Sequence, residues 1–185
     1  MAKINACIFI SGAGTNLKIL IKNSRDYNFP INISLICSNN KEAPGLRFAK
    51  KYSIPYKIIN LQDNLFEIKI LNEIKKKRIS LICLAGYMKI LSNKFIKSFN
   101  GKIINIHPSL LPKYKGINTF SRILKNKEII SGCTVHYVNK KLDAGNVILK
   151  KFVGIAKDDD EKSLKVKTQK AEYRAYSEAI VRLFK

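Results

Sequence analysis

The sequence lacks several features that would place a protein in a class at first sight. It has no apolar run near the roughly eighteen residues that a membrane-spanning helix needs, and no small-residue cleavage site follows its first residues. Its four cysteines lie at least 30 positions apart and form no C-x-x-C pair, which is typical of free core thiols in a reducing compartment. We therefore expect a cytoplasmic protein without a membrane partner.

Histidine is also scarce. The two histidines, His107 and His136, narrow the search for a general acid or base near neutral pH. They lie 29 positions apart, without a cysteine or carboxylate at ligand spacing, so no metal is expected. The sequence also has no serine or cysteine nucleophile in a recognisable elbow. This favours direct attack by a bound amine over a covalent enzyme intermediate.

Acidic residues are few, 13 against 35 basic ones, and the net charge is +22. Such a charge is typical of proteins that bind nucleic acid or anionic surfaces. Of the 35 basic residues, however, six are arginine and the other 29 are lysines spread along the whole chain. An A·T-rich coding sequence produces this mixture of Lys, Ile and Asn. We expect no specific nucleic-acid partner, and an attraction of anionic substrates that salt weakens.

The rest of the composition is that of one globular domain. At 185 residues and 46% hydrophobic content, the chain is long enough for a substantial core. Apolar β-rich runs alternate with segments of helical spacing, which predicts a Rossmann-like, doubly wound and mostly parallel α/β sheet. The expected strands are Ile4 to Ile10, Ile31 to Cys37, Tyr56 to Asn60, Ser80 to Leu84 and Lys102 to Ile106. The expected helices are Leu17 to Asn23, Leu46 to Lys51, Leu65 to Lys77 and Asn93 to Phe99.

The pattern changes after His107. A loop to Asn118 and a helix around Phe120 to Asn126 precede two expected strands, Cys133 to Val138 and Val147 to Val153, which predict a hairpin-like extension. The acidic residues 158–161 suit the start of a last helix that ends near Phe184, because negative charge is favourable at a helix N-terminus.

The stretch from Gly101 to Pro112 is the most informative part of the chain. An apolar strand ends in Asn105-Ile-His107, and side chains two apart on a strand project to one face. Pro108 and Pro112 stiffen the turn that follows. A neutral hydrogen-bond donor beside a proton carrier at a strand end indicates an active site. A loop with a satisfied histidine is the alternative.

A glycine-rich turn follows the first strand, at Ser11-Gly-Ala-Gly-Thr-Asn16. Glycines between a strand and a helix let backbone N–H groups approach an anion. The turn is neither a Walker loop nor a dinucleotide fingerprint, so its length suits a monophosphate on a small substrate. A purely structural tight turn is the alternative.

Two more residues complete the candidate site. His136 lies on a strand face with Thr134 and Val138, where we expect it to pack or to line a substrate rather than transfer a proton. Asp143 lies in a Leu-Asp-Ala-Gly stretch that by itself predicts only a turn. With Asn105 and His107 it suits acyl transfer, in which Asn donates to an oxyanion, His moves or stabilises charge, and Asp raises the pKa of the His.

The combined strings resemble the phosphoribosylglycinamide formyltransferases (GAR transformylases), the folate-dependent family of purine synthesis, over nearly the whole chain. The resemblance rests on 10–16, 84–91, 105–116, 132–138 and 142–145, in family order. It implies transfer of a formyl group to the amine of 5'-phosphoribosylglycinamide from 10-formyltetrahydrofolate, a consumed co-substrate. It further implies a single domain, with a phosphate-binding half at about 1–100 and a catalytic and folate-binding half at about 101–185, and a possible homodimer.

The resemblance also assigns roles. Asn105 would hold the formyl oxygen, His107 would be the catalytic acid, and Asp143 would raise its pKa. The residues implied to bind phosphoribosylglycinamide are Gly14, Thr15, Asn16 and Glu172. Those implied to bind the folate are Met88, Lys89, Ile90, Leu91 and Asn105.

Departures from the family pattern bear on substrate affinity. Lys89 replaces a frequent Arg, and Phe120, Tyr173 and Ser177 replace His, His and Pro. An upstream folate-contacting Arg has no match, the nearest positions being Asp63 and Asn64.

Three other interpretations compete with this one. Methionyl-tRNA formyltransferase needs a further C-terminal domain, for which we expect no room. Formyltetrahydrofolate deformylase carries an N-terminal regulatory domain, whereas the first strand here begins at residue 4. A basic α/β nucleic-acid-binding module rests on the charge alone.

Overall fold

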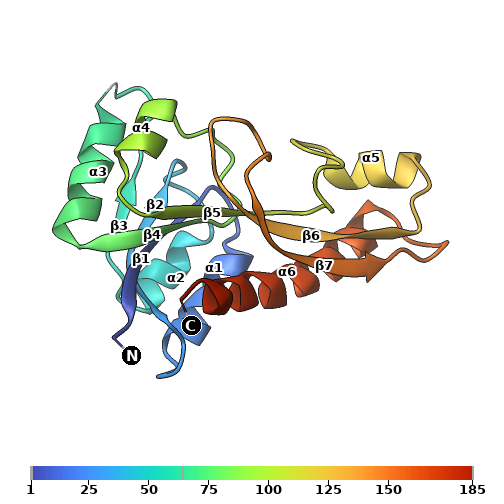
Figure 1. The fold of residues 1–185 in the computed structure, drawn as a ribbon, viewed down its shortest axis with the longest axis horizontal. Helices are drawn as coiled ribbons and strands as arrows, with labels where there is room; N and C mark the ends of the chain where they lie inside the picture. Colours follow the sequence, from blue (N-terminus) through green and yellow to red (C-terminus); the bar gives the residue numbers. More distant parts are fainter. Residues whose placement is uncertain (1, 64, 185) are drawn as a thin grey trace. The chain divides into compact units, whose positions relative to one another are not determined.

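The computed structural model describes residues 2–63 and 65–184, so Asn64 lies outside the described residues. Its strands form a seven-stranded sheet in the order β3-β2-β1-β4-β5-β6-β7 (Figure 1). The chain divides into two compact units: an N-terminal unit up to Ile104, and a C-terminal unit, Asn105–Leu183. Strand β5 (Lys102–His107) begins in the first unit and ends in the second.

The N-terminal unit is the doubly wound part of the fold. Strand β1 pairs in parallel with β2 and β4, and β2 pairs in parallel with β3. Figure 1 shows α1 and α2 on one face of these strands and α3 and α4 on the other. The prediction of a mostly parallel α/β sheet is confirmed. The bounds are β1 (Ile4–Ile10), α1 (Thr15–Ser24), β2 (Ile31–Ser38), α2 (Leu46–Lys51), β3 (Tyr56–Ile58), α3 (Phe66–Lys76), β4 (Ile79–Leu84) and α4 (Asn93–Ser98).

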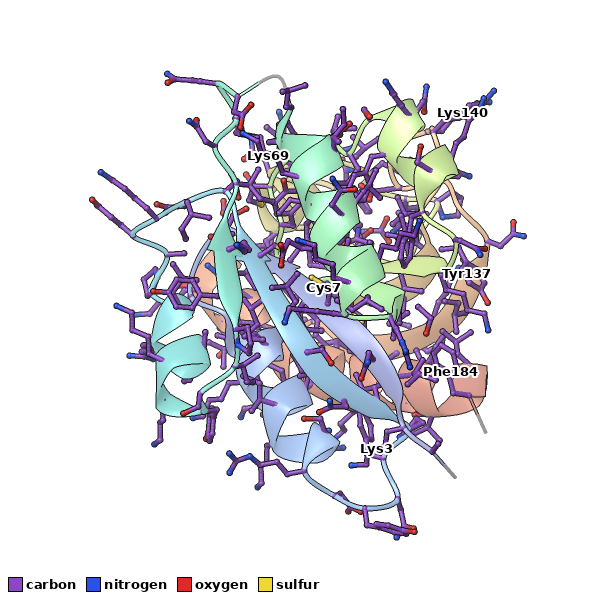
Figure 2. All side chains as sticks on the ribbon, turned by 90° about the vertical axis from the view of Figure 1, so that its left-hand side faces the viewer. Lys3, Cys7, Lys69, Tyr137, Lys140 and Phe184 are labelled. Carbon is purple, nitrogen blue, oxygen red and sulfur yellow. The ribbon has the colours of Figure 1, made fainter. Side chains whose placement is uncertain are left out.

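The core of this unit explains its continuous apolar strands. Ala6 to Ile10 are buried, as expected for a strand covered by helices on both faces. Cys7 lies in the interior, whereas Lys3 and Lys69 lie at the surface (Figure 2). Its sulfur is 3.7 Å from that of Cys37. All four cysteines are buried and none of them is in a disulfide, as predicted.

Strand β3 is shorter than predicted, ending at Ile58 instead of Asn60. The backbone N–H of Ile59 still donates to Ser38 O at 2.7 Å. Asn60 then starts a turn, since its side-chain oxygen accepts from the N–H of Gln62 at 3.1 Å. The competing side-chain hydrogen bond ends the strand.

The C-terminal unit contains the predicted hairpin. Its elements are α5 (Thr119–Lys125), β6 (Ile130–Tyr137), β7 (Val147–Gly154) and α6 (Glu161–Phe184). Strands β6 and β7 pair antiparallel, from Ile130 opposite Gly154 to His136 opposite Val147. Strand β6 begins three residues before the predicted Cys133. The start of β6 could not be predicted from its sequence, because neither the exposed Ile130 nor Gly132 continues a buried apolar run.

Helix α6 starts at the predicted acidic cluster. The Asp160 carboxylate accepts from the Ser163 N–H at 2.7 Å, and the Ser163 hydroxyl accepts from the Asp160 N–H at 3.0 Å. This reciprocal cap satisfies donors that the first turn leaves unpaired. Within residues 2–63 and 65–184, no helix is long and apolar enough to cross a membrane.

Candidate active site

The turn after β5 is held by a buried threonine as well as by its prolines. The Thr134 hydroxyl donates to Ser109 O at 2.7 Å and accepts from the Leu111 N–H at 3.0 Å. The Ser109 hydroxyl donates to Lys113 O at 2.6 Å. These bonds fix the path of the chain immediately after His107, a residue that is 6% exposed.

The loop that carries Asp143 is closed against β6. A Cβ atom at Gly145 would lie 1.7 Å from Tyr137 O, so only glycine fits there. The Tyr137 N–H donates to Asn146 O at 2.9 Å. Asp143 itself has a φ of 46°, in the left-handed region that Asp tolerates better than most residues. Backbone contacts therefore hold this carboxylate in place.

The Asp143 carboxylate joins the predicted catalytic residues. Its Oδ2 lies 3.3 Å from His107 Nδ1 and accepts from the Gly116 N–H at 2.9 Å. Its Oδ1 accepts from Asn105 Nδ2 at 3.4 Å and lies 3.6 Å from His136 Nε2. The structure thus brings Asn105, His107 and Asp143 together, with His136 as a fourth member. We call these four residues the carboxylate cluster.

Both ring nitrogens of His107 face acceptors. Nε2 lies 2.8 Å from Tyr114 O, and Nδ1 faces the Asp143 carboxylate. Burial nevertheless lowers the pKa of His107 below its ordinary value, against the Tyr114 carbonyl and Asp143, which both raise it. Asp143 thus raises the pKa of His107, while burial makes the net shift downward.

The pKa of Asp143 also lies below its ordinary value. Burial raises this pKa, but the neighbouring His136 ring, the hydrogen bond from the Gly116 N–H and the charge of His107 together outweigh burial. Asp143 is therefore ionised at neutral pH, as a residue that stabilises an imidazolium must be.

His136 is oriented by its own strand. Its Nδ1 lies 2.8 Å from Tyr137 O, which can only accept, so Nδ1 carries a proton. In the neutral ring, Nε2 is then an acceptor, and Asn105 Nδ2 donates to it at 3.2 Å. His136 thus helps to orient the amide of Asn105, and its role stays a prediction.

This arrangement has the chemistry of acyl transfer. An amide donor and an imidazole lie at the end of one strand, and an ionised carboxylate supports the charged form of the imidazole. Such groups stabilise negative charge that develops on a carbonyl oxygen. No group of three or more metal-ligating side chains is found among the described residues.

The glycine-rich turn at residues 11–16, which we call the anion loop, leads into α1 in the N-terminal unit. Gly14 has a φ of 69° and caps the helix, and Thr15 is its first residue. The first turn contains no acidic side chain, so no carboxylate there neutralises the positive end of the helix dipole. Gly45 packs on the loop, with its N–H donating to Gly12 O at 3.0 Å. A Cβ at Gly45 would lie 2.9 Å from Gly14 Cα.

The predicted folate segment follows β4 in the same unit. Met88 is 68% exposed and Ile90 is 78% exposed, whereas Leu91 is buried. Because β1 and β4 are parallel neighbours, the anion loop and this segment both leave the sheet at the carboxyl ends of its strands. The chain proceeds outward from β1 to β2 and β3 and then returns to β4 on the other side. Such a switch point is where doubly wound sheets bind ligands.

Glu172 lies on α6 in the C-terminal unit and is 8% exposed. Burial and then the charge of Glu172 raise the pKa of the Cys133 thiol to about 12. On the same helix, the Ser177 hydroxyl donates to Tyr173 O at 3.0 Å. Of the two departures from the family pattern on α6, the Ser177 side chain therefore contacts the backbone at Tyr173.

Two hollows of about 360 and 420 Å³ flank β3 in the N-terminal unit. Ile58 lines both of them. None of the predicted binding or catalytic residues lines either hollow. The candidate site is therefore identified by its chemistry and not by cavity size.

Sequence reasoning missed three contributors to the carboxylate cluster: Thr134, Tyr114 and Gly116. Tyr114 and Gly116 act through backbone atoms, so their side chains give no direct signal. The Lys-Tyr-Lys-Gly string that contains them was the available clue. For Thr134 the sequence indicates only a position beside His136 on one strand face.

Comparison with known proteins gives a consistent result. The model of the formyl transferase family matches residues 4–180. The chain is 40% identical to the phosphoribosylglycinamide formyltransferase of Haemophilus influenzae over 173 residues, covering 91% of this chain and 82% of the relative. It is 38% identical over 182 residues to the trifunctional purine biosynthetic protein adenosine-3 of Drosophila melanogaster, covering 95% of this chain and spanning only 14% of the relative.

A solved structure agrees with these sequence relatives. The crystal structure of phosphoribosylglycinamide formyltransferase from Brucella melitensis has a TM-score of 0.93 and 35% identity to this chain. The match covers 98% of this chain and 95% of the other.

Proposed function

The chain belongs to the formyl transferase family, and from this premise we propose that it is a phosphoribosylglycinamide formyltransferase of de novo purine biosynthesis. It transfers the formyl group of 10-formyltetrahydrofolate to the amine of 5'-phosphoribosylglycinamide. The names of the similar proteins support phosphoribosylglycinamide as the acceptor of a formyl group, and the folate donor is inferred from the family resemblance. The observation that carries the proposal is the carboxylate cluster, in which Asp143 contacts both Asn105 and His107.

The reaction needs no covalent enzyme intermediate. The amine nitrogen attacks the formyl carbon, and the formyl oxygen becomes an anion that the Asn105 amide and protonated His107 stabilise. The bond from the formyl carbon to folate N10 then breaks. The proton that the amine loses ends on N10, and tetrahydrofolate leaves. Asp143 favours the charged imidazole throughout, as its 3.3 Å distance to His107 Nδ1 supports.

The substrates are assigned to separate groups of residues. Gly14, Thr15 and Asn16 hold the ribose phosphate, supported by the positive end of α1, and Glu172 contacts the ribose. Residues 88–91 hold the folate together with Asn105, supported by the exposed apolar side chains of Met88 and Ile90. A homodimer and a cytoplasmic location stay predictions from the sequence.

The test is a spectrophotometric assay of folate product formation from 10-formyltetrahydrofolate, with and without phosphoribosylglycinamide. Turnover that requires the ribonucleotide is the expected result. Turnover indifferent to it would indicate a deformylase-like hydrolase. Absence of turnover in both conditions, with circular dichroism showing a folded protein, would contradict the proposal.

A further inference from the structure

Ser11, the first residue after β1, bridges two other loops of the N-terminal unit. Its hydroxyl donates to Asn39 Oδ1 at 2.5 Å, in the loop after β2. The same hydroxyl accepts from the Met88 N–H at 2.8 Å, in the segment after β4. A serine hydroxyl has one proton to donate and lone pairs to accept, and Ser11 uses both functions between loops.

The backbone of Ser11 makes the same connections. Its N–H donates to Gly86 O at 3.1 Å, and its carbonyl accepts from Asn40 Nδ2 at 3.4 Å. Each polar group of Ser11 therefore contacts the loop after β2 or the segment after β4. A residue that merely completed a turn would direct these groups to its own neighbours.

Beyond Ser11, each proposed binding segment is fixed on one side. The segment after β4 is held by the Ala85 N–H, which donates to Phe9 O at 2.8 Å, and by the Tyr87 ring, 5.2 Å from that of Phe9. The anion loop is held by the Gly45 N–H on Gly12 O. Ser11, the first residue of the anion loop, connects it to the segment after β4 by hydrogen bonds to Met88 and Gly86.

We propose that Ser11 is a positioning residue that couples binding of the ribonucleotide to binding of the folate. The inference rests on the proposed function, because it requires the anion loop to hold the phosphate and residues 88–91 to hold the folate. A phosphate that fixes the anion loop fixes Ser11, whose hydroxyl then holds the Met88 N–H in place for the folate. Such coupling is reciprocal, so the folate must strengthen ribonucleotide binding by the same factor.

The coupling is measured by calorimetric titration of tetrahydrofolate, with and without saturating phosphoribosylglycinamide. In the wild-type protein we expect the ribonucleotide to strengthen tetrahydrofolate binding about fivefold, the net worth of one hydrogen bond. In Ser11→Ala this factor should fall to about one. An uncoupled wild-type protein, or a Ser11→Ala variant with unchanged coupling, would overturn the proposal.

Steady-state kinetics separates positioning from catalysis. Ser11→Ala should raise KM for both substrates about fivefold and change kcat by less than about twofold. Ser11→Thr, which keeps a hydroxyl, should recover most of the loss. The matched control is Ser34→Ala, because that hydroxyl lies on β2 and accepts from Asn32 Nδ2 at 3.3 Å. A rise in one KM alone would mean that Ser11 supports a single segment and would refute the coupling.

The proposed function and the role of Ser11 are disproved by different results. Wild-type protein that never consumes phosphoribosylglycinamide disproves the proposed function. Wild-type protein that does so, with a Ser11→Ala variant equal to it in coupling and in both KM values, disproves only the role of Ser11.

Discussion

Replacing Asp143 by Asn tests the electrostatic support of His107 with little change in shape. Two unit charges 3.3 Å apart interact by about 5 kcal/mol at an effective dielectric constant of about 20. The carboxylate also serves His136 and the Gly116 N–H, so we expect less than this limit. A loss of about 1 to 3 pKa units is typical for an adjacent opposite charge. The pKa of His107, already lowered by burial, should therefore fall further.

The kinetic consequence follows from the protonated fraction of His107. Each unit lost from its pKa removes about tenfold of the imidazolium at pH 7, so kcat should fall about 10- to 10³-fold. KM should change little, because Asn keeps the size of Asp and an oxygen for the Gly116 N–H. The assay is an NMR titration of the two imidazoles, together with kcat between pH 6 and 8.

A surface carboxylate provides the matched control. Asp26→Asn removes a carboxylate that accepts from the Asn28 N–H at 2.8 Å at an exposed site, and neither kcat nor the imidazole titrations should change. The reasoning would be refuted if the pKa of His107 stayed constant or rose in Asp143→Asn. It would equally be refuted if kcat were retained while KM rose.

Three further predictions follow from the same unit. Asn105→Ala should lower kcat on the order of 10²- to 10³-fold, as for loss of an oxyanion donor, and near-normal kcat in steady-state assays would contradict this. Thr134→Val leaves the Leu111 N–H without its acceptor, so the free energy of unfolding measured in urea melts should fall by about 1 to 3 kcal/mol. An unchanged urea midpoint would show that Thr134 does not hold the turn after β5. The pKa values of His107 and Asp143 are both lowered by folding, so the folded state binds fewer protons. Their stabilisation is present above about pH 6.5 and should decline as pH falls through the range of His107 and then of Asp143, which urea midpoints measured from pH 7.5 to 4 would check.

Sequence reasoning located the fold because each element had a local signal. Strand β1 has the predicted bounds, since an apolar run between polar ends leaves little choice. The Asn105-x-His107 pattern predicted a shared face, and the structure brings both side chains to Asp143. An isolated Asp in a turn has no specific signal, so Asp143 could be predicted as their partner only from the chemistry of acyl transfer and from the family resemblance.

Other features depend on tertiary packing and left no such signal. The acceptor for His107 Nε2 is the backbone of Tyr114, a residue with a φ of 58° that no sequence pattern indicated. The net downward shift of the pKa of His107 reflects burial of the ring, which depends on tertiary packing. The bridge at Ser11 likewise appears only when the loops after β1, β2 and β4 are placed side by side.

The contact between Asp143 and His107 has a consequence for the order in which the protein folds. It joins positions 36 residues apart, so the carboxylate arrives only after the chain between them has closed into a loop. Contacts of such long sequence separation tend to form late in folding. We therefore expect native helices to form before the site is complete. Recovery of activity after dilution from denaturant should lag behind recovery of far-ultraviolet circular dichroism. The lag would measure how long the site takes to form after the helices.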